Sequence, residues 1–239
     1  MATYDTGSLT MVSIGLLSRS QLFAALSPRT QRHIAEKGLL AEYAPGSDLY
    51  HQGDPPTPLF ILQSGRVKLY RQSKDKCQIL ALPVPGDCLG AESLSTGTSS
   101  PYSATALTPV SAVCLPPDVL HSLLDEQPDF QEAFLRLITE RLKQFVTLVH
   151  DLAFRDVTSR LATVLILRAE VEGRHFDDGI IFDRLLSQQE FADMVGTARE
   201  VVYRTFKKFE DDGLVRMSRS TILIRDLEAL RSIALLEAR

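Results

Sequence analysis

Residues 187–215 constrain this chain most, because they read as two short helices joined by a tight turn. Ser187 and Glu190 have the spacing of a capping box, so a first helix is expected to begin there. Gly196 tolerates positive φ at low cost and is expected to end that helix. Thr197, with a glutamate three residues later, repeats the capping-box spacing and predicts a second helix that begins at once.

The second of these helices has an apolar side and a basic outward side. Its apolar positions are Val201, Val202, Phe206 and Phe209. Its basic positions are Arg199, Arg204, Lys207 and Lys208. Two short capped helices, a glycine turn and a basic second helix predict a helix-turn-helix, because the second helix of that motif enters the DNA major groove N-terminus first.

The side chains at the start of the second helix suit the recognition of bases. The planar fork of an arginine meets the O6 and N7 acceptors of guanine together, and a glutamate can accept from a cytosine N4. The same residues also fit a plainer interpretation, in which Glu200 only caps the helix and the basic residues form a solvated face. Taken alone, these residues leave both interpretations open.

Three short motifs in this stretch match those of a known family. They are the Gln-Gln-Glu start at Gln188, the Val-Gly turn at Gly196 and the Asp-Gly-Leu-Val exit that ends at Val215. With them, the chain resembles the cyclic-AMP receptor protein/FNR (CRP/FNR) family of bacterial transcription regulators. The alternating segment 216–224 resembles the family's wing, a hairpin that lies against the phosphate backbone of DNA.

The resemblance implies that this chain binds double-stranded DNA and reads it with three side chains. Arg199, Glu200 and Arg204 stand where the catabolite-activator branch of the family places its base-reading Arg, Glu and Arg, which implies a TGTGA-like half-site. The further candidates for contact with DNA are Gln188, Thr197, Lys207 and the wing residue Arg219.

From residue 40 to residue 115 the pattern changes to short apolar segments separated by Gly and Pro, which indicates a small antiparallel barrel or jelly roll. The segments expected to form strands are 59–62, 67–70, 79–82 and 112–115. The glycines that match the family's cyclic-nucleotide-binding fold are Gly46, Gly53, Gly65, Gly86 and Gly90. The predicted fold class is therefore α+β, with an N-terminal barrel, a long helix and a C-terminal winged helix-turn-helix.

In the family, the ligand phosphate lies in a short segment that corresponds to residues 90–104 here. Cyclic-AMP binders use a Glu for the ribose hydroxyl and an Arg-Ser pair for the phosphate, whereas this chain offers Glu92 and, in place of Arg-Ser, Tyr102-Ser103. A buried phosphate without a cation loses its strongest charge-assisted bonds. The sequence therefore argues against cyclic AMP as the effector. The candidate effector-binding residues are Gly90, Glu92, Tyr102 and Ser103, with purely structural roles as the alternative; the effector itself stays unknown.

Cysteine and histidine usage argues against a heme or an iron-sulfur cluster. Cys77, Cys88 and Cys114 are scattered and form no CxxC motif, so roles as small buried hydrophobes are expected, with thiol sensing as the alternative. Cluster-binding relatives group cysteines near the N-terminus, whereas none precedes Cys77 here. The five histidines are isolated in sequence, and none sits in a heme-ligand motif.

A long helix is predicted from about residue 128 to residue 152. Its apolar residues repeat at spacings of three and four, at Leu135, Ile138, Leu142, Phe145, Val149 and Leu152. Such a heptad seam serves either a coiled-coil partner or a single-chain core. The resemblance assigns the segment to the dimer helix of a homodimer, so the operator is expected to be a near-palindrome.

Segments 154–162 and 172–180 flank the next predicted helix. The first resembles the family's junction between the dimer helix and the DNA-binding domain, and buried positions are expected after it at Leu161, Val164, Leu165 and Ala169. The second reads as a polar loop. In catabolite-activator relatives the corresponding loop touches RNA polymerase, so residues 175–178 are candidates for that contact, with a plain surface loop as the alternative.

Two shorter helices and an arm complete the prediction. Ser27 as cap and Pro28 at the first helical position mark a helix that runs towards Lys37. Asp118 is expected to cap a short helix that follows the barrel. Residues up to Leu17 show no period and are expected to form a flexible arm.

Composition is that of an ordinary globular protein, with 44% hydrophobic and 23% charged residues among 239. No apolar run reaches membrane-spanning length and no secretory signal is recognisable, so a cytoplasmic protein with no membrane partner is expected. The net charge is −4, but residues 199–219 hold six basic and four acidic side chains, so DNA binding would depend on local geometry. A glycine-rich phosphate loop, a metal-ligand cluster and a catalytic acid–base motif are all missing, which argues against an enzyme with a regulatory nucleotide-binding domain.

The sequence therefore predicts a homodimeric sensory transcription regulator in three parts: a sensor barrel (18–127), a dimerisation helix (128–153) and a winged helix-turn-helix (154–239). A signal at the barrel is expected to change the packing of the heptad seam, and hence the spacing of the two recognition helices. The alternative keeps DNA binding but makes the protein effector-free or controlled by thiol chemistry.

Overall fold

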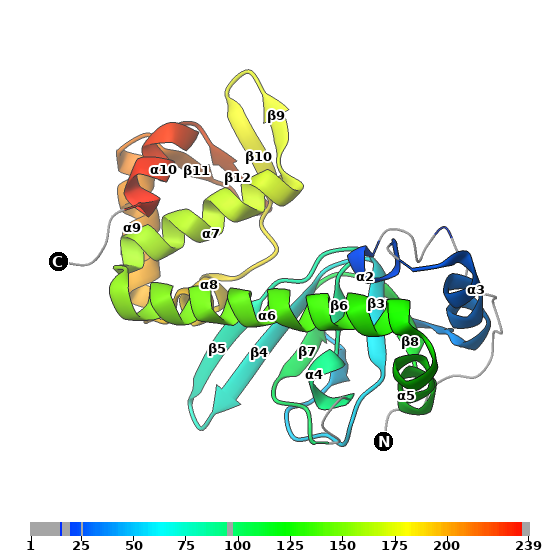
Figure 1. The fold of residues 1–239 in the computed structure, drawn as a ribbon. Helices are drawn as coiled ribbons and strands as arrows, with labels where there is room; N and C mark the ends of the chain where they lie inside the picture. The colour runs from blue at the N-terminus through cyan, green and yellow to red at the C-terminus, as the bar shows by residue number, and fades with distance from the viewer. Residues whose placement is uncertain (1–14, 16–19, 25, 95–97, 236–239) are drawn as a thin grey trace. The chain divides into compact units, whose positions relative to one another are not determined.

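The computed structural model describes residues 15, 20–24, 26–94 and 98–235, and in it the chain divides into two compact units (Figure 1). The first comprises residues up to Asp75 together with 80–144, and the second comprises residues 76–79 and 145–239. The arm expected up to Leu17 lies outside the described residues, apart from residue 15. The three-part division at residues 127 and 153 stays a prediction.

Apart from residues 76–79 of β5, two four-stranded sheets belong to the first unit, and the described strand pairings in them are antiparallel. One sheet has the order β1 (Leu39–Tyr43), β8 (Val110–Leu115), β3 (Leu59–Ser64) and β6 (Cys88–Leu89). The other has the order β2 (Asp48–Tyr50), β7 (Ser103–Ala106), β4 (Val67–Ser73) and β5 (Lys76–Ala81). This arrangement confirms the jelly roll and the four predicted strands, which are β3, β4, β5 and β8; the shorter strands were not predicted.

The helices of this unit are α2 (Gln21–Ala24), α3 (Pro28–Lys37), α4 (Ala91–Leu94), α5 (Pro117–Glu126) and the first part of α6 (Pro128–Phe154). The prediction for α3 is confirmed, because the Ser27 side chain accepts from the backbone N–H of Thr30 and Pro28 is the first helical residue. The cap predicted for α5 is wrong. Pro117 begins that helix with its φ already helical, so Asp118 lies inside the first turn.

The core of the first unit gathers apolar side chains from β3, β6 and β8 and from helices α2, α3, α5 and α6. Strand β3 is buried on both faces from Leu59 to Gln63. Phe130 of α6 is fully buried, with its ring 6.4 Å from the ring of Phe23. The start of the long helix is therefore anchored in the core of the barrel.

After α6, the described part of the second unit contains four helices and one sheet. Its elements are α7 (Val157–Glu172), β9 (Arg174–Phe176), β10 (Gly179–Asp183), α8 (Gln188–Val195), α9 (Arg199–Asp211), β11 (Val215–Met217), β12 (Thr221–Ile224) and α10 (Leu227–Ala234). The sheet has the order β11-β12-β10-β9. The buried positions predicted on α7 are confirmed at Leu161, Val164, Leu165 and Ala169. Among the described residues, none of the helices is long and apolar enough to cross a membrane.

The polar loop predicted at 172–180 is wrong, because this segment forms the hairpin of β9 and β10. Gly179 makes the hairpin possible. Its φ is 133°, and a Cβ atom there would lie 2.0 Å from the carbonyl oxygen of Ile224. Only glycine fits, since both the conformation and the space exclude a side chain. The Asp-Gly step at Asp178 was the available turn signal.

The second capping box, predicted at Thr197, is also wrong. Helix α9 begins one residue later, with Ala198 in the cap position and without a side-chain cap bond. The backbone N–H of Thr197 donates instead to the carbonyl of Ala192, at 3.0 Å, and so closes the end of α8. Thr197 therefore belongs to the end of α8, and α9 begins after it.

Ser187 and Thr197 give a matched test of these cap assignments. Ser187→Ala removes a side-chain acceptor at the start of α8 and should lower the free energy of unfolding by about 1 kcal/mol. Thr197→Ala removes no cap and should change it by less than about 0.5 kcal/mol. Urea denaturation followed by circular dichroism measures both. Equal losses for the two variants would contradict the assignment of Ala198 as the cap.

Candidate nucleic-acid interface

Helix α8 is fixed at both ends, which sets the position of the helix after it. The Ser187 hydroxyl accepts from the N–H of Glu190 at 3.2 Å, and the Glu190 carboxylate accepts from the N–H of Ser187 at 2.9 Å, so the predicted capping box is confirmed. At the other end Gly196 is left-handed, with φ 68°. The turn into α9 is therefore short and defined by backbone bonds.

Helix α9 presents one buried and one exposed face. Val202, Thr205, Phe206 and Phe209 are buried, and the ring of Phe206 packs edge-on against Phe191 of α8 with centroids 5.2 Å apart. Val201, predicted to be buried, is only half-buried. The exposed face carries Arg199, Glu200, Tyr203, Arg204 and Lys207.

The start of α9 and the start of α8 line a common groove with a volume of about 580 Å³, here called the base groove. Its lining residues are Gln188, Arg199, Glu200, Tyr203 and Arg204. Four of these were candidates from sequence. Tyr203 was missed, although its position four residues after Arg199 places both on one helix face. Three ionic side chains and an aromatic ring thus line one groove.

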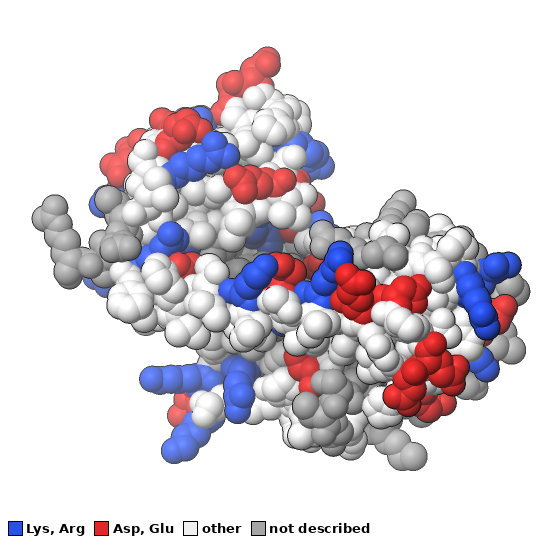
Figure 2. All heavy atoms as spheres, viewed as in Figure 1, with Lys and Arg blue, Asp and Glu red and all other residues white. Residues whose placement is uncertain are grey.

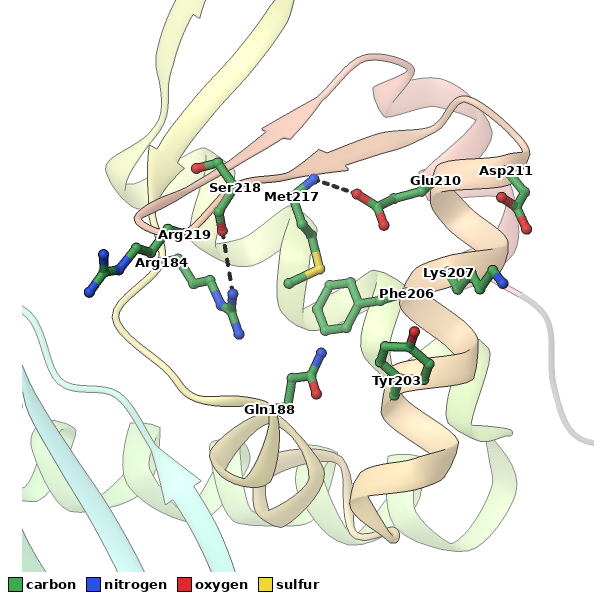
Figure 3. A pocket seen from close by; sticks show the side chains of 10 residues that line it. All are labelled: Arg184, Gln188, Tyr203, Phe206, Lys207, Glu210, Asp211, Met217, Ser218 and Arg219. Atoms are coloured by element: carbon green, nitrogen blue, oxygen red, sulfur yellow. Dashed lines mark hydrogen bonds between the residues drawn. The ribbon is translucent and has the colours of Figure 1, made fainter.

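The predicted wing is present as the hairpin of β11 and β12. Its turn is closed by Ser218, whose hydroxyl accepts from the N–H of Thr221 at 2.9 Å. A second groove of about 480 Å³, here called the wing groove, lies between this hairpin, α8 and α9 (Figure 3). Its lining residues are Arg184, Gln188, Tyr203, Phe206, Lys207, Glu210, Asp211, Met217, Ser218 and Arg219.

The two grooves bring together most of the residues proposed for DNA contact. Gln188 and Tyr203 line both, so the base groove and the wing groove adjoin. Lys207 and Arg219 line the wing groove, whereas Thr197 lines neither. Arg184 was missed, because nothing in its local sequence distinguishes it.

Charges of both signs are interspersed on the face of the molecule seen in Figure 2, and this face carries no broad basic field. Lys and Arg side chains and Asp and Glu side chains occur on this face in small groups of either sign. This distribution agrees with the net charge of −4. Attraction to a polyanion must therefore come from local groups.

In the first unit, the candidate effector residue Glu92 forms a largely buried ion pair. Glu92 of α4 pairs with Arg141 of α6 across 3.6 Å, and both side chains are at least four-fifths buried. Arg141 also donates to the backbone carbonyl of Cys88 at 3.0 Å. Sequence analysis missed Arg141, because it reaches the site from a distant helix.

Two tyrosines fill the space beside this ion pair. Tyr102 is only 2% exposed, and its ring lies 6.1 Å from that of Tyr50, which stacks on Phe60. Burial raises the pKa of both phenols above their usual range, and the nearby Glu92 carboxylate raises it further. Ser103 accepts from the backbone N–H of Gln52 at 2.9 Å. Tyr50, Tyr102 and Ser103 are thus all buried inside the first unit.

The thiols of the two buried cysteines ionise poorly. Burial raises the pKa of the Cys88 thiol and of the Cys114 thiol to about 12 in each case. Reaction with an oxidant proceeds through the thiolate, so these two thiols are protected from oxidation. Cys77 is half-buried. Within the part of the chain that the structure describes, no group of three or more His, Cys, Asp or Glu is arranged to hold a metal ion.

The outer face of α6 is apolar and exposed. Leu135, Leu142 and Val149, spaced seven residues apart, are 66%, 62% and 65% exposed, and Val146 is 61% exposed. Ile138, Phe145 and Leu152, the other members of the predicted seam, are half-buried. An apolar stripe of this period is typical of a helix that pairs with another helix.

A helix-turn-helix with a wing in one unit and a jelly roll in the other define the class of protein: a DNA-binding transcription regulator. Comparison with known proteins agrees. The model of the cyclic nucleotide-binding domain matches residues 40–127, and that of the Crp-like helix-turn-helix domain matches residues 159–233.

Individual relatives extend over most of the chain. A CRP-like cAMP-activated global transcriptional regulator of Mycobacterium tuberculosis strain H37Rv is 29% identical over 216 residues, covering 90% of this chain and 96% of its own. The global nitrogen regulator of Synechocystis sp. is 30% identical over 185 residues, covering 76% and 82%. The structure of FixK2 from Bradyrhizobium japonicum has the same fold, with a TM-score of 0.74 at 19% identity, covering 84% of this chain and 99% of FixK2. The chain belongs to the CRP/FNR family of transcription regulators.

The side chains of Glu92 and Arg141 should be coupled energetically, because they form an ion pair. Arg141→Gln leaves the carboxylate in the barrel without its guanidinium and should lower the free energy of unfolding by about 1–3 kcal/mol. Adding Glu92→Gln should recover part of that loss, with a coupling energy of about 0.5–3 kcal/mol. Urea unfolding of the single and double variants measures it.

The exposed pair of Arg136 and Glu132 on the same helix is the control. Arg136→Gln should cost less than about 0.5 kcal/mol, because exposed ion pairs contribute little. Strictly additive losses for Arg141→Gln and Glu92→Gln would show that the buried pair is not coupled.

Proposed function

We propose that this transcription regulator acts as a homodimer on a near-palindromic operator with TGTGA-like half-sites, under the control of a signal at the sensor barrel. The observation that carries the proposal is the base groove, where Arg199, Glu200 and Arg204 converge at the start of α9. In a helix-turn-helix this end of the second helix meets the base edges.

The chemistry of the base groove suits a sequence that contains guanine and cytosine. Arg199 and Arg204 can each present a guanidinium fork to the O6 and N7 atoms of guanine, and Glu200 can accept from a cytosine N4. These three side chains are exposed, and α9 begins without a side-chain cap bond, so Glu200 is not needed as the partner of a capping box. The TGTGA-like half-site follows from the family resemblance at the three positions.

The homodimer is supported by the apolar stripe on α6. Leu135, Leu142 and Val149 would form one position of a heptad and Ile138, Phe145 and Leu152 the other. Two chains paired by a twofold axis would place two copies of α9 about one DNA turn apart, at roughly 34 Å. The operator would then mirror the symmetry of the protein.

We propose that the controlling signal is not cyclic AMP, although a relative of this chain is cAMP-activated. Tyr102 occupies the position of the expected phosphate-binding arginine, and the nearby Arg141 is already paired with Glu92. A cyclic nucleotide would have to break that pair and displace buried tyrosines, and so lose charge-assisted bonds that the chain already makes.

The alternative regulator is effector-free or thiol-controlled, and Cys77 is then the candidate thiol, because the pKa values of Cys88 and Cys114 disfavour their thiolates. Mass analysis and absorbance spectra of the purified protein separate these possibilities. A bound small molecule, a heme band or a modified cysteine would each be decisive.

RNA polymerase is the further partner that we propose, at the tip of the hairpin of β9 and β10. His175, Phe176, Asp177 and Asp178 are all exposed there. A hairpin holds these side chains in a more defined arrangement than the loop predicted from sequence.

Arg199→Ala tests the base-reading assignment. The loss of one bidentate contact with guanine should raise the Kd for the operator about 5- to 150-fold and relax preference at one base pair per half-site. Binding titrations at fixed salt, against the operator and its single-base variants, measure both effects. Lys208→Ala is the matched control, because Lys208 is exposed on α9 but lines neither groove. Unchanged base preference in Arg199→Ala would refute the assigned role.

Leu142→Glu tests the dimer. Two carboxylates facing each other in an apolar seam should raise the Kd of dimerisation at least about 30-fold, equivalent to about 2 kcal/mol. Sedimentation velocity over a range of concentrations measures the effect. Thr147→Glu, which introduces the same charge on α6 away from the seam, should leave the dimer intact. A monomeric wild type, or a Leu142→Glu variant that dimerises as tightly, would contradict the proposal.

A further inference from the structure

Tyr203 is an exposed aromatic residue on the side of α9 to which we assign base reading. The residue is 54% exposed, although its ring carries a large apolar area. It lines both the base groove and the wing groove, and Figure 3 shows its side chain on α9 among those that line the wing groove. The readout proposed for Arg199, Glu200 and Arg204 makes no use of this ring.

The position of Tyr203 on α9 follows from the helical repeat. Tyr203 lies four residues after Arg199 and directly before Arg204, so it stands one turn after Arg199 on the same side of the helix. The inner side of the helix is held in the core by Val202 and Phe206, which are buried. The ring therefore belongs to the first two turns of α9, the part of the second helix that reaches base edges.

The side chain of Tyr203 has no partner within the part of the chain that the structure describes. There its hydroxyl makes no hydrogen bond, and its ring packs against no other aromatic ring. Tyr50 and Tyr102 of the first unit, by contrast, are buried and lie ring against ring. An apolar ring left in water costs free energy that contact with an apolar group recovers. Tyr203 is therefore available to a ligand of α9.

We propose that Tyr203 determines sequence preference by packing its ring against the C5-methyl group of a thymine in each half-site. This inference rests on the proposed DNA-binding function. In the major groove the methyl group is the apolar feature that marks a thymine, and apolar side chains recognise it by contact. A TGTGA-like half-site suits this arrangement, because each of its guanines has a thymine as a neighbour.

The ring adds a discrimination that the arginines do not supply. Arg199 and Arg204 offer guanidinium N–H donors, which select the acceptors of guanine. The ring of Tyr203 offers apolar surface instead, which favours thymine over cytosine because cytosine has no methyl group at C5. Tyr203 is thus a specificity-determining residue that acts beside the two arginines and by a different interaction.

Deoxyuridine in place of thymidine tests the contact, because it removes the methyl group and keeps the hydrogen-bonding edge. Each thymine of an operator with TGTGA-like half-sites is replaced in turn, in both half-sites together, and the Kd of the full-length protein is measured at fixed salt. One methyl contact accounts for about a fourfold change, so the loss of two should raise the Kd about 15-fold at the contacted position. Tyr203→Phe, which keeps the ring, should show the same uracil effect, whereas Tyr203→Ala should show none.

Leu167→Ala is the matched control, because Leu167 is also 54% exposed but lies on α7 and lines neither groove. This variant should keep the wild-type Kd and the uracil effect. The proposal is overturned if no uracil substitution weakens binding of the wild type, or if Tyr203→Ala loses as much as the wild type at every thymine. Loss of the uracil effect in Tyr203→Phe would also overturn it, since the hydroxyl and not the ring would then make the contact.

The two assignments on α9 fail separately. If the uracil scan shows no effect but Arg199→Ala still relaxes base preference, only the role of Tyr203 is refuted. If Arg199→Ala keeps its base preference while the uracil effect depends on Tyr203, only the role of Arg199 is refuted.

Discussion

The packing of α9 against α8 is the interaction on which the rest of the DNA-binding unit depends. Phe206 meets Phe191 at 5.2 Å, and both rings are at most 2% exposed. Burial of a large apolar side chain contributes roughly 1.5–3 kcal/mol, so this contact fixes the rotation of α9 about its axis. The opposite face, which carries Arg199 and Arg204, is exposed as a consequence.

The same packing supports the wing. Glu210, near the end of α9, binds the backbone of β11, and Arg184 binds the backbone of the wing turn. A change in the rotation of α9 would therefore disturb the base groove and the wing groove together. This connection gives a physical reason for α9 and the wing hairpin to belong to one unit.

Features encoded in a few neighbouring residues could be predicted from the sequence. The capping box at Ser187 and the exit at Gly196 needed only local chemistry. The displaced cap at Thr197 could not be predicted, because its N–H is claimed by the end of the preceding helix. Long-range partners were also missed: Arg141 meets Glu92 only in the folded barrel, and the bonds of Arg184 exist only once the wing has formed.

Selection of bound duplexes from a random pool by the full-length protein tests the central claim most directly, that paired copies of α9 read base edges. The account predicts enrichment of near-palindromes with TGTGA-like half-sites, their centres about 10 base pairs apart. Enrichment of an unpaired half-site, or of no sequence at all, would contradict it.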